Sequence, residues 1–395
     1  MKCLWIARDL PFPVDAGDKI YSANLARSLA RAGARIRFIG FAAPGNAPAP
    51  NDWLVEWKGV IGRKRNAISA LFSSLPSVAA VHAVPAYRRA LDEEFRDSWD
   101  AIFFDNYGSG WALQYYLAAH GARRGLRPIL VYVSHNHEES VWRSMVRNAT
   151  GSWARRLVLW QNYLKARALE RALARHVGLI TAITEEDRDA YRAQHPEARL
   201  IVLPPGYSGG VTSARSITAR TPRRVVMVGS FRWLIKQENL RQFVRAADPR
   251  FAAHNIVFDV IGEIPEGLRE ELRSTSSAVR FHGFVPDPAH HLREARLAVV
   301  PELIGGGFKL KFLDYIFGRV PVAAIEGATA GLPAAVRQHM FARPDLQALV
   351  DVIVANIGNT ALLDRMQSQA HDAASSLFQW SDRGVRLREA IEVLR

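Results

Sequence analysis

A glycine-rich turn followed by two lysines stands out in the stretch PELIGGGFKLKFLDYIFGRVPV, residues 301–322. The turn follows an apolar run that predicts a buried strand, and it precedes a segment that predicts a helix. Glycines let a backbone approach a ligand closely, and the first N–H groups of a helix favour an anion. With two ammonium groups nearby, the pattern predicts a site for a diphosphate; a plain strand–helix turn with solvated lysines is the alternative. The residues are Gly305, Gly306, Gly307, Lys309 and Lys311.

A carboxylate follows on the same predicted helix. Asp314 comes three residues after Lys311, so the two side chains share roughly one helical face. A carboxylate in this place can accept hydrogen bonds from vicinal sugar hydroxyls, as acidic residues do in dinucleotide-binding folds. The pattern therefore predicts a nucleotide, with its phosphates at the lysines and its ribose at Asp314.

Three other strand-like runs in the second half of the chain also end at a glycine. They end at Gly229, Gly262 and Gly283, within GSFRWLIKQENL (229–240), VIGEIP (260–265) and FHGFVPD (281–287). After the first of these, Arg232 or Lys236 could reach a phosphate. Because ligands of doubly wound folds bind at the carboxyl ends of strands, these turns are expected to meet at one site.

Apolar strand-like runs alternate with amphipathic helical patterns along the whole chain. This alternation predicts parallel sheets with helices on both faces. A cluster of prolines, glycines and small polar residues at 203–224 interrupts the pattern and predicts a linker. We therefore predict an α/β protein with two doubly wound, Rossmann-like domains. The predicted parts are an N-terminal domain (1–205), a linker (206–222), a C-terminal domain (223–378) and a terminal helix (379–395) that crosses back to the first domain.

The order of these motifs resembles glycosyltransferase family 4, the retaining enzymes of the GT-B fold, in which two such domains face a central cleft. The resemblance covers the whole chain and is strongest at 225–332. It rests on Gly229, Gly262, the run Gly283-Phe284-Val285-Pro286-Asp287, the spacing from Ala295 to Pro301, the glycines and lysines of 305–311, Asp314, and Pro321-Val322.

The resemblance implies a nucleotide-sugar donor held by the C-terminal domain. Lys309 and Lys311 match basic residues that contact the donor diphosphate, and Asp314 matches a Glu that binds the ribose. The implied donor contacts are Gly229, Ser230, Arg232, Lys236, Gly262, Phe284, Val285, Gly305, Gly306, Gly307 and Phe308. Three positions depart from the family pattern: Asp314 is shorter than Glu, Gly306 replaces the first Glu of the motif, and Ser230 replaces a frequent Arg.

Two loops of the first half could complete the site. The loop within RDLPFPVDAGDK (8–19) resembles the family's glycine loop, with Asp15, Ala16 and Gly17 near the donor phosphate and the acceptor; an ordinary strand–helix loop is the alternative. In VSHNHEES (133–140), the resemblance favours His135 as a catalytic contact to the donor sugar, with Asn136 and Glu138 on the acceptor side. Domain closure would bring His135 and Gly17 to the donor. A metal site and a surface histidine pair are alternatives, and we expect neither a metal nor another cofactor.

The composition is that of a globular protein, with 49% hydrophobic and 23% charged residues among 395. Cys3 is the only cysteine, which excludes an internal disulfide and a cysteine-based metal cage. The sequence shows neither an apolar run long enough to cross a membrane nor a signal peptide, so a cytoplasmic location is expected.

The formal net charge of +14 suits an anionic partner: nucleic acid, an anionic membrane or a phosphorylated substrate. A solvated, arginine-rich surface explains it equally. Residues 142–176 combine cations with tryptophans, which suits peripheral contact with the inner face of a membrane; a helix packed on the sheet is the alternative.

We therefore expect a retaining glycosyltransferase that moves a sugar from a nucleoside-diphosphate sugar to a hydroxyl of a glycan or lipid-linked acceptor. The setting implied by the resemblance is bacterial polysaccharide or glycoconjugate assembly. The alternatives are a non-catalytic partner subunit of the same fold, a sugar-nucleotide epimerase and a nucleic-acid-binding protein. No recognised nucleic-acid-binding module occurs in the sequence, so nucleic acid is not an expected partner.

Overall fold

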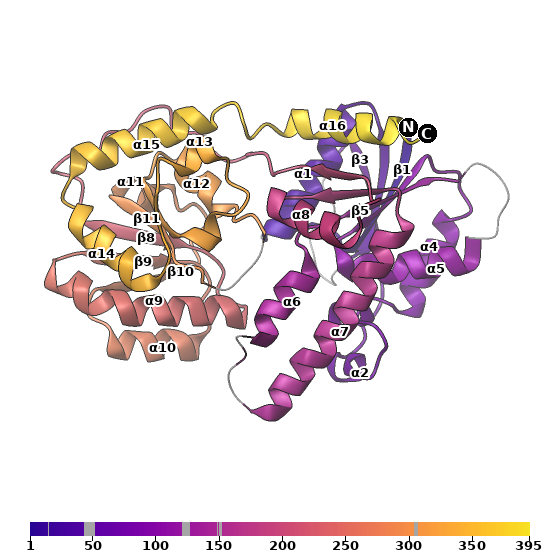
Figure 1. Ribbon diagram of the computed structural model, residues 1–395, viewed down its shortest axis with the longest axis horizontal. Helices are drawn as coiled ribbons and strands as arrows, with labels where there is room; N and C mark the ends of the chain where they lie inside the picture. The colour runs from indigo at the N-terminus through magenta and orange to yellow at the C-terminus, as the bar shows by residue number, and fades with distance from the viewer. Residues whose placement is uncertain (15, 43–51, 121–126, 148, 150–151, 304–306) are drawn as a thin grey trace. The chain divides into compact units, whose positions relative to one another are not determined.

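The computed structural model describes residues 1–14, 16–42, 52–120, 127–147, 149, 152–303 and 307–395. The chain folds into two compact units, each with a parallel sheet covered by helices (Figure 1). Unit 1 comprises Met1–Gly206 together with Gln379–Arg395, and unit 2 comprises Tyr207–Phe378.

Unit 1 is built on a seven-stranded parallel sheet with the order β3-β2-β1-β4-β5-β6-β7. Its strands are β1 (Lys2–Asp9), β2 (Arg35–Phe41), β3 (Val55–Val60), β4 (Ala101–Asp105), β5 (Ile129–Val133), β6 (Leu179–Ala182) and β7 (Leu200–Val202). Its helices are α1 (Gly17–Arg31), α2 (Ala67–Leu71), α3 (Ser77–Ala80), α4 (Pro85–Glu94), α5 (Gly110–His120), α6 (Glu138–Arg147), α7 (Trp153–His176), α8 (Glu185–Gln194) and α16 (Trp380–Glu392), with a 3₁₀ turn at Tyr107–Ser109. Helix α16 packs against α1, so both ends of the chain belong to this unit.

Unit 2 has a six-stranded parallel sheet with the order β10-β9-β8-β11-β12-β13. Its strands are β8 (Arg224–Val228), β9 (Val257–Ile261), β10 (Val279–Gly283), β11 (Leu297–Val300), β12 (Val322–Ile325) and β13 (Phe341–Arg343). Its helices are α9 (Leu234–Ala253), α10 (Glu266–Thr275), α11 (Ala289–Glu294), α12 (Lys311–Phe317), α13 (Ala334–Arg337), α14 (Leu346–Asn356) and α15 (Thr360–Ala374), with a 3₁₀ turn at Glu326–Thr329. The prediction of two doubly wound domains is confirmed.

Each sheet begins in its middle, and this determines where a ligand can bind. The first strand, β1 or β8, starts a run of strands towards one edge, and the chain then returns to continue on the other side of that first strand. The neighbours β1 and β4, and likewise β8 and β11, therefore flank a topological switch point. Connecting segments diverge there, which leaves a crevice at the carboxyl ends of the two strands.

The central strands form because their apolar runs are buried on both faces of the sheet. Strand β4 (AIFFD) and strand β11 (LAVV) are buried along their whole lengths. Helices supply the second layer of each core, for example through Leu169 and Leu173 of α7 in unit 1. Rigid sheets of this kind hold the polar residues at their carboxyl ends in place.

The predicted linker is 206–222, and all of it from Tyr207 onward belongs to unit 2. The backbone N–H of Thr212 donates to the carbonyl of Phe317 (2.9 Å), and that of Ile217 donates to Asp364 Oδ1 (2.8 Å). Its small polar residues therefore make ordered contacts. In the described part of the chain no single helix is long and apolar enough to cross a membrane, although the bent pair α14 and α15 passes by length and composition.

Candidate functional site

Three glycines lie side by side at the carboxyl ends of β8, β9 and β10 in unit 2. The N–H of Gly229 donates to the carbonyl of Ile261 (3.0 Å), and the N–H of Gly262 donates to that of Gly283 (2.7 Å). Gly262 has φ +128°, and a Cβ added to it would lie 1.7 Å from the carbonyl oxygen of Gly229. Only glycine fits there, so this position fixes the turn that carries Gly229.

Lys311 reaches this same edge from the neighbouring strand–helix connection. Its Nζ lies 2.7 Å from Glu302 Oε1, and a Cβ added to Gly229 would lie 3.4 Å from that Nζ. The Lys311 side chain is only 12% exposed, which fixes its ammonium group beside the turn after β8. Lys309 Nζ donates to the carbonyl of Gly307 (3.1 Å), a residue with φ +67°. Two of the predicted phosphate contacts, Gly229 and Lys311, are thus neighbours at the switch point of unit 2.

Glu302 is the residue of this site that the sequence analysis missed. It follows β11 by two residues and is buried. Burial raises the pKa of this carboxyl, but the charges of Lys311, Lys309 and Lys236 outweigh that effect and lower it to about 2. Lys311 therefore contacts this carboxylate, and the charges of Lys309 and Lys236 also act on it. The sequence contains a partial signal for Glu302, because an acidic residue so soon after an apolar strand is unusual. Its contacts with the lysines depend on the fold.

The helix after the glycine-rich turn is shorter than predicted. The pattern predicted a helix from Phe308, but α12 begins at Lys311. The N–H groups of Phe312 and Leu313 already donate to the carbonyls of Lys309 and Leu310 (3.0 and 2.9 Å). Those two amides are therefore used within the first turn, and positive charge at this site comes mainly from lysine side chains. Gly305 and Gly306 lie outside the described residues.

Asp314 lies on α12 near the phenol of Tyr207. Its side chain reaches solvent, yet the surrounding protein removes enough water to raise its pKa to about 6. Tyr207 stacks on Phe317 with ring centroids 4.5 Å apart, which supports its position. A carboxylate with this pKa is mostly ionised at pH 7 and accepts hydrogen bonds.

The other predicted donor contacts of unit 2 have different settings. Arg232 forms an ion pair with Glu263, with Nε 2.6 Å from Oε2, and Ser230 is half-buried beside it. Phe284 is exposed after β10, whereas Val285 and Phe308 pack against the core of unit 2. Lys236 lies in the first turn of α9.

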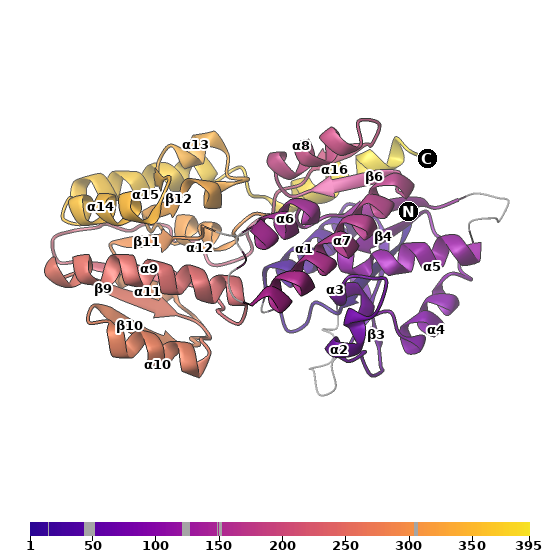
Figure 2. The ribbon, with the colours of Figure 1, turned by 60° about the horizontal axis from the view of Figure 1, so that its bottom comes forward.

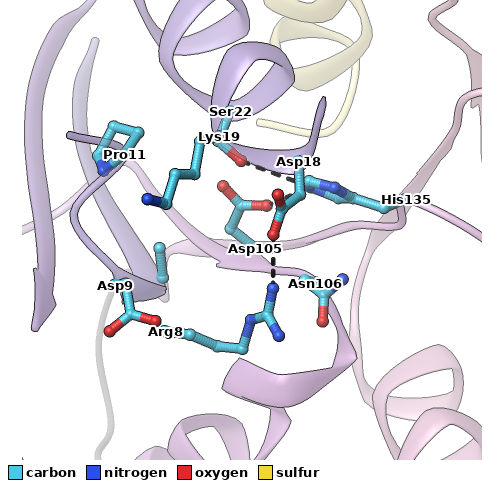
Figure 3. A pocket seen from close by; sticks show the side chains of 10 residues that line it. Arg8, Asp9, Pro11, Asp18, Lys19, Ser22, Asp105, Asn106 and His135 are labelled. Carbon is cyan, nitrogen blue, oxygen red and sulfur yellow. Dashed lines mark hydrogen bonds and ion pairs between the residues drawn. The ribbon is translucent and has the colours of Figure 1, made fainter. Parts of the chain in front are cut away.

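Unit 1 has a polar pocket at its own switch point, between the carboxyl ends of β1 and β4 and the start of α1 (Figure 3). The pocket is lined by Ala7, Arg8, Asp9, Pro11, Asp18, Lys19, Ser22, Asp105, Asn106 and His135. Most of these side chains carry a charge or a hydrogen-bonding group. Such a lining suits a ligand that is rich in hydroxyl groups.

His135 is held in this pocket by a carboxylate. Its Nε2 lies 2.6 Å from Asp105 Oδ1, and the indole N–H of Trp5 donates to Asp105 Oδ2 (2.8 Å). Ser22 Oγ lies 3.5 Å from the same imidazole nitrogen. Because both His135 and Asp105 are buried, this network fixes the orientation of the ring. Asp105 and Trp5 were missed by the sequence analysis, although the run AIFFDN already ends in two polar residues.

The charged side chains around His135 are paired with one another. Arg8 donates to Asp18 (2.7 Å), as Figure 3 shows, and Lys64 donates to Asp9 (2.5 Å). Burial raises the pKa of Asp9, but hydrogen bonds with His82 and Lys64 outweigh it and hold the pKa well below its usual range. The pocket therefore contains carboxylates that are held by hydrogen bonds.

The predicted acceptor residues after β5 lie beside a buried pair of acids. Asn136 Nδ2 donates to Glu138 Oε1 (3.2 Å). Glu170 of α7 accepts the backbone N–H groups of Glu138 (2.9 Å) and Glu139 (2.7 Å). Burial raises the pKa of Glu138 and of Glu170, and the charge of Glu170 raises that of Glu138 further. The lining of the pocket around His135 does not include Asn136 and Glu138, and their acceptor-side role stays a prediction.

Of the predicted glycine loop, Gly17 begins α1 and Ala16 accepts the first helical hydrogen bond, from the N–H of Ile20 (2.9 Å). Asp15 lies outside the described residues. Asp18 and Lys19, which follow Gly17, line the pocket around His135. Within the described part of the chain, no three His, Cys, Asp or Glu residues are grouped closely enough to hold a metal ion.

Solved structures with a similar fold cover essentially the whole chain. Sucrose-phosphate synthase from Thermosynechococcus elongatus has a TM-score of 0.71 and 16% identity, with 100% of this chain and 99% of that chain covered. WaaG, a glycosyltransferase involved in lipopolysaccharide biosynthesis, has a TM-score of 0.65 and 16% identity, covering 98% and 99%. HepE from Anabaena, solved in complex with UDP and glucose, has a TM-score of 0.64 and 15% identity, covering 100% of both chains. The fold is therefore GT-B. Comparison with curated proteins gives no match.

Two family models match successive parts of the sequence. A glycosyl transferase 4-like domain matches residues 17–206, and a domain of glycosyl transferases group 1 matches residues 222–359. Together they cover most of the chain. The chain is a glycosyltransferase of the GT-B type and belongs to the family that combines these two domains.

Proposed function

We propose that the chain is a retaining glycosyltransferase that moves a sugar from a nucleoside-diphosphate sugar to a hydroxyl of a glycan or lipid-linked acceptor. The observation that carries the proposal is the place of Lys311. Its ammonium group lies beside Gly229 at the switch point of unit 2, with Lys309 and Lys236 near the same carboxylate. This is a concentration of positive charge where a doubly wound fold binds phosphates.

In the proposed reaction, the bond between the anomeric carbon and the β-phosphate oxygen of the donor breaks. The acceptor oxygen bonds to that carbon on the same face of the sugar, and its proton passes to the departing phosphate oxygen. Negative charge grows on the diphosphate as it leaves, and fixed ammonium groups stabilise that charge most at the transition state. The lysines supply this charge, so the proposal includes no metal and no other cofactor.

Unit 1 supplies the acceptor side of the proposal and also His135, the proposed contact to the donor sugar. The pocket of His135 offers imidazole, amide and carboxylate groups that can hydrogen-bond the hydroxyls of a sugar. Asp105 holds the imidazole, so its orientation does not have to be set when substrate arrives. A glycan in bacterial polysaccharide or glycoconjugate assembly is the proposed acceptor.

A thermal-shift screen with UDP, GDP, CDP, ADP and dTDP tests the donor part. The screen is run in EDTA, because no metal is proposed. We expect one nucleotide to raise the Tm by several degrees and to identify the base. The absence of a shift with all five would contradict the proposal. Product analysis by NMR then reads the anomeric configuration, and inversion would contradict retention.

Binding of the donor should depend on pH through Asp314. Its pKa is raised to about 6, so it is ionised above that pH and protonated below it. A protonated carboxyl accepts the ribose hydroxyls less well, so the donor Kd should rise as pH falls from 7 to 5. The Asp314→Asn variant should bind about tenfold more weakly at pH 8 and lose this dependence. Calorimetry with the nucleotide sugar measures it, because the terminal phosphate of a free nucleoside diphosphate itself titrates near pH 6. An unchanged pH profile in the variant would contradict the role of Asp314.

Helix α7 supports the further proposal of peripheral contact with an anionic membrane. Its residues that pack on unit 1 begin at Asn162 and lie on one face. Trp153, Leu157, Trp160 and Leu164 follow one another at helical spacing on the opposite face. Trp153 is 78% exposed and Trp160 49% exposed, and the exposed Arg156 lies at the side of this row. Tryptophans with neighbouring arginines suit the interface of an anionic bilayer.

The vesicle-binding prediction concerns this outer face. The double variant Trp153→Ala/Trp160→Ala should lose at least about tenfold in partitioning to vesicles of phosphatidylcholine and phosphatidylglycerol (3:1). Wild-type binding should weaken in pure phosphatidylcholine and at high salt. Co-sedimentation measures both. Trp53→Ala removes another exposed tryptophan of unit 1 and serves as the matched control. Equal binding by the wild type and the double variant, or retention on DNA in place of vesicles, would contradict the proposal.

A further inference from the structure

Glu302 places a negative charge inside the cluster of lysines that is proposed to bind a diphosphate. Its side chain is 5% exposed, and its Oε1 lies 2.7 Å from Lys311 Nζ. Lys309 and Lys236 act on the same carboxylate, from the loop before α12 and from the first turn of α9. The carboxylate is thus shared by cations from two connections of the sheet.

An acid at this position requires an explanation, because a fixed negative charge repels a bound diphosphate. Three lysines without a counter-charge would also repel one another. The ion pair with Glu302 balances the charge of Lys311 and fixes its Nζ beside Gly229. Glu302 therefore has two effects: it orients one cation, and it cancels one of three positive charges.

We propose that Glu302 is a positioning residue that holds Lys311 at the phosphate site and weakens retention of the released nucleoside diphosphate relative to the donor. This inference rests on the proposed function. In a nucleotide sugar each phosphate bears one negative charge. After transfer, the terminal phosphate has a second ionisable oxygen with a pKa of about 6, so the product carries a further charge near pH 8. The more highly charged product is repelled more strongly by Glu302 than the donor is.

The test compares two ligands on one variant. Calorimetry at pH 8 measures the Kd of the nucleoside diphosphate selected by the thermal-shift screen, and of its glucose ester. In Glu302→Gln the product should bind about tenfold more tightly, and the donor should gain clearly less. The ratio of the two Kd values is the decisive quantity. A residue that only supports the local structure would change both affinities together and leave this ratio unchanged.

Three further variants make the result interpretable. Glu302→Asp keeps the charge and should restore the wild-type ratio. Lys236→Met removes one cation and leaves the ion pair between Lys311 and Glu302 in place. It should weaken binding of the product more than binding of the donor. Glu294→Gln removes a carboxylate that pairs with Arg224, the first residue of β8 at the other end of the strand, and should leave the ratio unchanged.

The outcomes separate this inference from the proposed function. If the wild type binds neither ligand, the proposed donor site fails and the inference fails with it. If the wild type binds both, and neither Glu302→Gln nor Lys236→Met changes the ratio, only the inference is overturned. Should Glu302→Gln fail to fold, Lys236→Met alone decides, because an unchanged ratio in that variant contradicts the charge argument.

Discussion

Replacing Lys311 with alanine is expected to abolish stabilisation by the nucleoside diphosphate and to lower kcat/KM at least about 100-fold. The Lys311 ammonium is the cation fixed most firmly at the switch point of unit 2, through its contact with Glu302 and its place beside Gly229. A charge held in advance stabilises the departing diphosphate without further rearrangement. Steady-state kinetics with the selected donor and a thermal-shift titration measure the two effects.

This variant also leaves a buried carboxylate without its closest cation, which lowers stability by about 3 kcal/mol. The lowered pKa of Glu302, about 2 against an ordinary 4.5, stabilises the folded protein above pH 4.5, and this contribution disappears as pH falls towards 2. The stability difference between wild type and variant should therefore be largest near neutral pH. Urea unfolding at several pH values measures it.

The matched control for Lys311→Ala is Arg224→Ala. Arg224 forms an ion pair with Glu294 of α11, and its Nε lies 3.9 Å from the carboxylate of the buried Asp259. Its loss should lower stability and leave nucleotide binding unchanged, because β8 begins there and the site lies at its other end. Retention of full nucleotide stabilisation by Lys311→Ala would contradict the assignment of the phosphate site.

The fold could be predicted because the central strands are read directly from their apolar runs. Strands β1, β4, β8 and β11 are short, largely buried apolar segments. The predicted runs AIFFDN, RVVMVGS and LAVVPEL contain β4, β8 and β11, and the predicted run KCLWIA covers all but the last two residues of β1. Three of the four edge strands, β3, β7 and β13, were not predicted, whereas the fourth, β10, was. Strands β7 and β13 have only three residues each, and β3 (VEWKGV) mixes polar and apolar residues. At an edge, strand formation depends on the neighbouring strand more than on the segment itself.

The site could be predicted only in part, because its missed residues depend on which strands are neighbours. Glycines and lysines that cluster in the sequence were visible as a phosphate-binding pattern. The role of Asp105 was not visible in the sequence. Its contact with His135 requires β4 to lie beside β5, and its contact with Trp5 requires β4 to lie beside β1. The role of Glu302 likewise depends on the fold, because Lys236, whose charge acts on this carboxylate, lies 66 residues earlier in the sequence. Charged pairs across a parallel sheet leave no local signal.

Replacing Gly262 with alanine is expected to lower the stability of unit 2 by at least about 3 kcal/mol. Two costs combine at this position. A φ of +128° is strained for any residue with a side chain, and the new Cβ would lie 1.7 Å from the carbonyl oxygen of Gly229. Relief requires the turn after β8 to move, which would displace Gly229 from Lys311. Nucleotide binding should therefore weaken together with stability, and urea unfolding with a thermal-shift titration measures both.

Two other glycines separate these costs. Gly283 has φ +70° with open space around its Cβ position, so Gly283→Ala should cost about 1 kcal/mol from backbone strain alone. Gly267 lies in α10 with open space and no positive φ, so Gly267→Ala should be neutral or stabilise by up to about 1 kcal/mol. From the most to the least stable variant, the expected order is Gly267→Ala, then Gly283→Ala, then Gly262→Ala. If Gly262→Ala were no less stable than Gly283→Ala, the close approach of the two turns would not hold in solution. Gly262 would then not be the residue that fixes the turn after β8.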